Sequence, residues 1–147
     1  MLCEGRGVAP AMEISEALDF VRTNHHAVLS TLRRDGTPQL SPVTVGVDAG
    51  GRVVISTRQT AVKTKNLARD PRAWLAVFTP GFYGEWVQVS GPVEIVSLPE
   101  ALPLLEDYYR SVSGEHPDWD DYRAAMVRDQ RCLIRITPAE VGPTVAG

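Results

Sequence analysis

The stretch VVISTRQTAVKTKNLARDPRAWLAVF, residues 53–78, places two apolar runs on either side of a short polar segment. The apolar runs are rich in β-branched and aromatic residues and predict strands, and the second run is apolar on both faces, as in a central strand. Segment 60–69 predicts a helix, which the Asp-Pro pair at 70–71 ends because the residue before a proline disfavours helical backbone. The two lysines of the chain, Lys63 and Lys65, both lie at the start of this helix. A helix start carries partial positive charge, so this placement needs an explanation.

Charge is distributed unevenly along the chain. The net charge of −3 argues against a nucleic-acid-binding protein. Residues 52–72 nevertheless hold six of the fifteen basic residues and one acid, Asp70. The six basic residues are Arg52, Arg58, Lys63, Lys65, Arg69 and Arg72. A local positive patch on an acidic protein indicates a small anionic ligand rather than a polyanion.

The length of 147 residues corresponds to one domain. Residues 1–12 contain Gly and Pro without periodicity and predict a flexible N-terminal extension, which leaves 13–147 as the folded domain. The sequence lacks the apolar region of a secretory signal and any apolar run of transmembrane length. Its two cysteines, Cys3 and Cys132, do not make a disulfide framework. We therefore expect a cytoplasmic protein that does not bind membranes.

Short strands dominate the predicted fold. Tight turns or one short helix link the first four, and the RDGT turn at 34–37 contains an Asp-Gly pair that readily adopts positive φ. We therefore predict a mainly β protein with flanking helices (α+β), in which a six-stranded antiparallel sheet closes into a small barrel. The predicted strands are 26–33, 38–47, 52–57, 72–78, 85–96 and 131–136.

Three further helices are predicted to pack outside the barrel. Their expected N-caps are Ser15, Ser97 and Asp118, residue types whose side chains accept hydrogen bonds from free N–H groups. Aromatic residues at helical spacing in the last two helices are interpreted as packing residues, with one of them as a candidate to line a pocket. These residues are Tyr108, Tyr109, Trp119 and Tyr122.

The helix that carries the lysines has the features of a phosphate site. Its first N–H groups have no partner within the helix, and a bound phosphate would accept them and pair with a lysine ammonium. Arg58 lies just upstream, and three threonines add hydroxyl donors, namely Thr57, Thr60 and Thr64. The alternative is a solvated helix face, on which Lys63 and Lys65 point to water at a cost of roughly 0.3–1 kcal/mol.

Several motifs of this sequence resemble those of the pyridoxamine 5'-phosphate oxidase-like split β-barrel proteins. The strings PQLSPV, VVIST, KTKNLARDPRAWLAV and VQVSGPVEIV follow in the order and spacing of that family. The string SGEHPDWDDYRAAMV, followed by an apolar strand, is similar to the branch that uses the deazaflavin coenzyme F420. The resemblance covers about residues 14–138. It implies a homodimer with the cofactor at the subunit interface, and hydride transfer from reduced F420 to an enone, quinone or tetrapyrrole.

The resemblance also assigns cofactor-binding residues. Ser56 and Thr57 would lie near the ribityl chain and phosphate, and Lys63 would hold the phosphate with Thr64 beside it. Trp86 would lie near the cofactor, from the same or the partner subunit. The residues along the tricyclic ring would be Gln39, Leu40, Ser41, Pro42 and Val43.

Two positions depart from the family pattern. Related F420 binders often have arginine where this chain has Ala61, and FMN-binding relatives often have it at the position of Val62. Arg58 and Lys65 are the candidates to replace the missing guanidinium. The tryptophan-and-arginine signature of true pyridoxamine phosphate oxidases is also missing from the C-terminal sequence, so we do not expect that activity.

Other interpretations stay open at this point. An FMN-dependent oxidoreductase on the same barrel is the nearest alternative, followed by a non-catalytic protein that binds a flavin, F420 or haem. Nucleic-acid binding by 58–72 is less favoured, because that stretch lacks interleaved aromatic residues. No catalytic constellation stands out in the sequence. His25 and His26 lack further ligands at metal-site spacing, so we predict no metal site.

Overall fold

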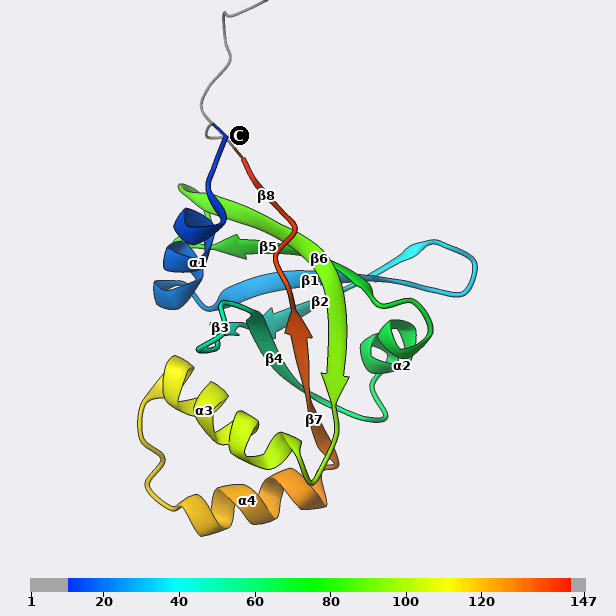
Figure 1. Ribbon diagram of the computed structural model, residues 1–147, viewed down its shortest axis with the longest axis vertical. Coiled ribbons are helices and arrows are strands. Elements are labelled where there is room, and N and C mark those ends of the chain that lie inside the picture. Colours follow the sequence, from blue (N-terminus) through cyan, green and yellow to red (C-terminus); the bar gives the residue numbers. More distant parts are fainter. Residues whose placement is uncertain (1–10, 144–147) are drawn as a thin grey trace, which may run out of the picture.

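In the part of the chain that the structure describes, eight strands form one curled antiparallel sheet that four helices surround (Figure 1). The computed structural model describes residues 11–143. The hydrogen-bonded strand order is β2-β1-β5-β6-β7-β4-β3, and β8 pairs with β6. The strands are β1 (His26–Leu32), β2 (Pro38–Thr44), β3 (Gly46–Val47), β4 (Val53–Arg58), β5 (Arg72–Phe78), β6 (Trp86–Val96), β7 (Arg131–Ile136) and β8 (Glu140–Gly142).

The predicted α+β split barrel is confirmed, and all six predicted strands are present. The count of six is too low by two short strands. The predicted strand 38–47 divides into β2 and β3 because Val45 turns its N–H to the carbonyl of His25 (2.8 Å). The other addition is β8, which lies in a segment without a run of β-forming residues.

Strand β6 joins the two halves of the sheet. Its first part pairs with β5 from Trp86 to Pro92, and its last part pairs with β7 from Val93 to Val96. The change of partner falls at Gly91-Pro92, a pair of residue types that marks a bulge or bend in a strand. A Cβ atom at Gly91 would lie 1.9 Å from the carbonyl oxygen of Thr137, so this close approach requires glycine.

The four helices are α1 (Ile14–Thr23), α2 (Val62–Arg69), α3 (Ala101–Ser113) and α4 (Trp119–Arg128). Asp118 caps α4 as predicted, accepting the N–H of Asp121 at 3.1 Å. The two predicted serine caps are wrong. Helix α1 begins one residue before Ser15 and is capped by Glu13 with Glu16, and α3 begins four residues after Ser97.

Two clusters of buried apolar side chains pack the helices against the sheet. The larger lies inside the barrel, and Met12 packs against it although the sequence assigns that residue to a flexible extension. Residues 1–10 of that predicted extension lie outside the described residues. The smaller core contains Leu105, Tyr122 and Leu133 and fixes α3 and α4 against β4 and β7. Across residues 11–143, no helix combines the length and apolar character needed to span a bilayer.

One face of the β1–β5–β6 sheet carries apolar side chains that are half-buried. Residues directly opposite in the register share this face, as with Phe78 and Trp86. Two more aromatic residues extend it, Phe82 and Tyr83, with 60% and 87% of their surface exposed. We call the following set the apolar sheet face: Val28, Leu32, Trp74, Ala76, Phe78 and Trp86.

Candidate functional site

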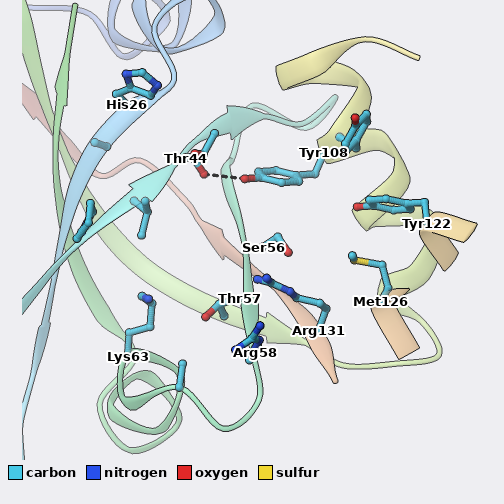
Figure 2. Close-up of a pocket in the computed structure, with 15 residues that line it drawn as sticks. His26, Thr44, Ser56, Thr57, Arg58, Lys63, Tyr108, Tyr122, Met126 and Arg131 are labelled. Carbon is cyan, nitrogen blue, oxygen red and sulfur yellow. Dashed lines mark hydrogen bonds between the residues drawn. The ribbon is translucent and has the colours of Figure 1, made fainter. Parts of the chain in front are cut away.

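A cavity of about 820 Å³ opens between the edge of the sheet and the α3–α4 pair (Figure 2). Strands β1, β2, β4 and β7 contribute to its wall, as do the start of α2 and the inner faces of α3 and α4. None of the residues lining it is acidic. The lining residues are His26, Ala27, Pro42, Val43, Thr44, Ser56, Thr57, Arg58, Ala61, Lys63, Tyr108, Tyr109, Tyr122, Met126 and Arg131.

Three basic side chains gather at one end of this cavity. Figure 2 shows Lys63, Arg58 and Arg131 around Thr57, each from a different element. None of the three forms an ion pair with a carboxylate of residues 11–143. The Nε atom of Arg131 is buried without a hydrogen-bond acceptor in the same range. We call Arg58, Lys63 and Arg131 the cationic end.

The start of α2 adds backbone donors to the cationic end. Ala61 is the N-cap residue, and no side chain caps the helix. The first turn contains no acid, and the first intrahelical bond runs from the N–H of Lys65 to the carbonyl of Ala61 (3.1 Å). The N–H groups of the preceding residues, including Lys63, therefore lack an acceptor within the helix. Free N–H groups beside three cations fit an anionic group such as a phosphate.

Residues of the KTKNLARDPR string hold α2 in this position. The buried Asn66 donates to the hydroxyl of Thr31 on β1 (3.1 Å), and Arg69 donates to the backbone carbonyl of Leu32. The hydroxyl of Thr64 donates to the carbonyl of Arg58 (2.6 Å). Asn66, Thr64 and Arg69 thus act as structural residues that place Lys63 at the cavity.

Tyrosines form the opposite wall. The hydroxyl of Tyr108 donates to the carbonyl of Thr44 (2.9 Å), and that of Tyr122 donates to the carbonyl of Leu105 (2.8 Å). Burial raises the pKa of Tyr108, and it raises the pKa of Tyr122 to about 12. Both phenols are therefore neutral donors at physiological pH. With Met126, they contribute aromatic and apolar side chains to the cavity wall, which suits a conjugated ring.

Half of the predicted site residues line the cavity, namely Pro42, Val43, Ser56, Thr57, Arg58 and Lys63. The structure places the other half outside its lining. Leu40 is 63% exposed, and Lys65 is also exposed, on the far side of the α2 start. Trp86 lies on the apolar sheet face and lines a separate cavity of about 240 Å³. The remaining three are Gln39, which accepts from Thr31, Ser41, whose hydroxyl is buried, and Thr64.

Several cavity residues were not among the predicted site residues. Arg131 begins a predicted strand, and the structure pairs this strand with β4 so that Arg131 lies opposite Arg58. The tyrosines of α3 and α4 were interpreted as packing residues, and they both pack and line the cavity. His26 lines the cavity at the start of β1, while His25 bonds to the carbonyl of Val45 (2.8 Å).

Comparison with known proteins agrees with this architecture. The family model described as pyridoxamine 5'-phosphate oxidase matches residues 14–144. A conserved hypothetical protein from Mycobacterium tuberculosis is 26% identical, with a TM-score of 0.72, and the match covers 95% of this chain and 88% of that one.

Two more distant structures share the fold. A protein named F420 reductase is 20% identical, with a TM-score of 0.66 over 96% of this chain and 98% of its own. A pyridoxamine 5'-phosphate oxidase-related, FMN-binding protein from Nostoc punctiforme is 16% identical, with a TM-score of 0.62 over 95% of this chain and 83% of its own.

Proposed function

The chain belongs to the pyridoxamine 5'-phosphate oxidase family, and from this premise we propose that it is an F420-dependent oxidoreductase. Proteins of this family hold a flavin-type cofactor, FMN or F420. In the proposed reaction a hydride passes from reduced F420 to a small or medium organic acceptor of the enone, quinone or tetrapyrrole class, and a proton from solvent completes the reduction. The cationic end is the observation that carries the proposal.

The cationic end would hold the cofactor phosphate. Lys63 supplies an ammonium next to the free N–H groups of α2, and Ser56 and Thr57 line the wall between it and Arg131. A charge-assisted hydrogen bond contributes about 1.5–3 kcal/mol, so two or three such contacts account for tight binding of a phosphate-bearing ligand.

The edge strand β2 would lie along the cofactor ring. Strand β2 stands at the end of the strand order, so no strand within residues 11–143 pairs with the backbone groups on its outer edge. Pro42 and Val43 bring this edge to the cavity wall opposite the tyrosines. A ring bound there would be shielded from water between β2 and the α3–α4 pair, which protects a hydride donor from side reactions.

A homodimer is the second part of the proposal. The apolar sheet face ends at the cavity, because His26 and Thr44 continue the same side of β1 and β2 to the cavity wall. A second copy seated on this face would cover Phe82 and Tyr83 and close the open side of the cavity. Gel filtration with light scattering tests this part, and a monomer at micromolar concentration would contradict it.

One observation favours FMN as an alternative. FMN carries a phosphate monoester with close to two negative charges, which suits three cations better than the single charge of the phosphodiester in F420. Fluorescence titration of both cofactors decides between them. The proposal expects tighter binding of F420, and exclusive binding of FMN would replace it with an FMN-dependent oxidoreductase.

Turnover separates an enzyme from a cofactor-binding protein. The protein, loaded with reduced F420 or reduced FMN, is mixed anaerobically with an enone, a quinone and a tetrapyrrole, and cofactor oxidation is followed by absorbance. Oxidation that depends on acceptor and protein supports the oxidoreductase. Tight binding without oxidation by the panel would indicate a non-catalytic flavin or F420 carrier.

A further inference from the structure

Two arginines stand directly opposite one another at the cationic end. Arg58 ends β4 and Arg131 begins β7, and the two are paired in the antiparallel register. Directly opposite side chains share one face of a sheet, and both of these line the cavity. Like charges in this arrangement destabilise a sheet, and Lys63 adds a third positive charge nearby (Figure 2).

Strand β7 also contains an arginine whose charge is neutralised by a carboxylate. Arg135 lies four residues along β7, directly opposite Glu94 of β6, and donates to its carboxylate. Arg131 lies beyond the residues of β7 that pair with β6, and its registered partner on β4 is Arg58. Its buried Nε atom has no acceptor within residues 11–143. A donor without an acceptor costs roughly 1–3 kcal/mol, more when it is charged.

We propose that Arg131 is an anion-binding residue of the cofactor site, with its guanidinium directed at the same phosphate as Lys63. The inference rests on the proposed function and adds a contact to it. Arg131 then provides the guanidinium that Ala61 and Val62 lack. An oxyanion between Arg58 and Arg131 turns their repulsion into attraction, and it supplies the acceptor for the buried Nε atom.

Thermal unfolding with inorganic phosphate tests this without any cofactor. The variants are Arg131→Gln and a control, Arg128→Gln, which removes an exposed arginine outside the cavity. At low salt without phosphate, Arg131→Gln should unfold at the same or a higher temperature than wild type, because it removes a like-charge pair. Phosphate should raise the unfolding temperature of wild type and of the control above that in chloride at equal ionic strength, and this shift should disappear in Arg131→Gln.

A structural arginine would give the opposite result. Arg131→Gln would then unfold several degrees lower without phosphate, or would keep the full phosphate shift, and either outcome overturns the inference. Arg131→Lys, which restores the charge without the planar fork, should recover part of the shift.

Pairs of ligands that differ in their phosphate test whether Arg131 contacts that part of the cofactor. FMN is compared with riboflavin, and F420 with its phosphate-free deazaflavin. Arg131→Gln should weaken the phosphate-bearing member about tenfold to hundredfold and leave the phosphate-free member unchanged. Equal weakening of both members overturns the inference.

The two proposals fail in different ways. If wild type shows the Arg131-dependent phosphate shift but binds neither FMN nor F420, the proposed function fails and the anion-binding role of Arg131 stands. If a cofactor binds and Arg131→Gln changes neither its affinity nor the phosphate shift, the inference on Arg131 fails alone.

Discussion

The cationic end of the cavity and the outer side of α3 and α4 both concentrate arginines, and the two regions differ in their carboxylates. On the helices, Arg123 donates to both oxygens of Glu106 (2.8 and 3.1 Å), and Arg110 pairs with Glu115 (2.9 Å). At the cationic end, Arg58, Lys63 and Arg131 have no acidic partner among the described residues.

This difference separates a structural role from a binding role. Where carboxylates surround an arginine, the ion pairs belong to the fold and are complete without a ligand. Where cations meet without acids, the isolated protein bears a repulsion that a bound anion removes. Substitutions in the two regions should therefore differ in whether they change cofactor affinity or stability, beginning with the variant expected to have the greatest effect.

An acidic residue introduced at the cationic end should give its cations a carboxylate partner within the protein, as Glu106 does for Arg123 on the helices. Ser56 lines the cavity close to Arg131 (Figure 2), so Ser56→Asp would supply the missing carboxylate. We expect cofactor affinity to fall by about 3 kcal/mol or more, because the new charge repels the phosphate. The unfolding temperature at low salt should rise. Calorimetric titration measures the cofactor affinity, and thermal unfolding measures the stability. An unchanged affinity would contradict a binding role for the cationic end.

The two lysines give a matched pair. Lys63→Ala should weaken cofactor binding by about 1.5–3 kcal/mol, since it removes a charge-assisted contact, and should leave the fold intact. Lys65→Ala removes the same charge two residues away, from an exposed side chain outside the cavity, and should change affinity little. Fluorescence titration compares them, and an equal loss in both variants would favour the solvated helix face.

On the helices, loss of a carboxylate should affect the fold and not the site. Glu106→Gln breaks the double hydrogen bond with Arg123 and should destabilise the protein by about 1–2 kcal/mol. Cofactor affinity should stay at the wild-type value. Urea unfolding measures the first effect, and a stability equal to wild type would show that this ion pair is dispensable.

The same pair predicts a pH dependence. The hydrogen bond from Arg123 holds the pKa of Glu106 below its ordinary value of 4.5. A lowered folded-state pKa contributes stability that is present above the unfolded value and lost as pH falls through the folded value. Wild type should therefore lose more stability than Glu106→Gln as the pH falls from 5 to 3, and parallel urea-unfolding profiles would contradict this.

Arg110 should give the smallest effect. It is partly exposed, pairs with three carboxylates and lies over the ring of Trp119 (4.3 Å). Exposed ion pairs are screened by solvent, so Arg110→Gln should cost less than about 1 kcal/mol of unfolding free energy. Thermal unfolding measures this effect. A loss of stability as large as that in Glu106→Gln would mean that solvent exposure does not determine how much these ion pairs contribute.

Much of the fold was predictable because local signals agreed with one another. The six main strands follow from apolar alternation and from turn residues, and α2 follows from the boundary at Asp70-Pro71. The serine caps failed because Ser15 and Ser97 lie near helix starts without being at them, and glutamates occupy the cap positions instead. Sequence alone does not distinguish such neighbours when several polar residues are adjacent.

Only six of the fifteen residues that line the cavity were among the predicted site residues, because its wall comes from elements that are distant in sequence. Ser56, Thr57, Arg58 and Lys63 lie within one stretch and were found together. The residues that complete the wall come from β1, β2, β7, α3 and α4, and in the last two helices the packing pattern conceals the second role of the tyrosines. Arg131 needed the structure, because the pairing of β4 with β7 that sets it opposite Arg58 joins segments more than seventy residues apart.

The bend of β6 at Gly91-Pro92 has a mechanical consequence. One continuous strand carries Trp86 on the apolar sheet face and, past the bend, binds β7, which begins with Arg131. In the proposed homodimer, a second subunit would contact the first part of this bent strand, and the proposed anion would lie near the start of β7, which pairs with its last part. We expect phosphate to tighten self-association, and by linkage we expect the dimer to bind phosphate more tightly than the monomer.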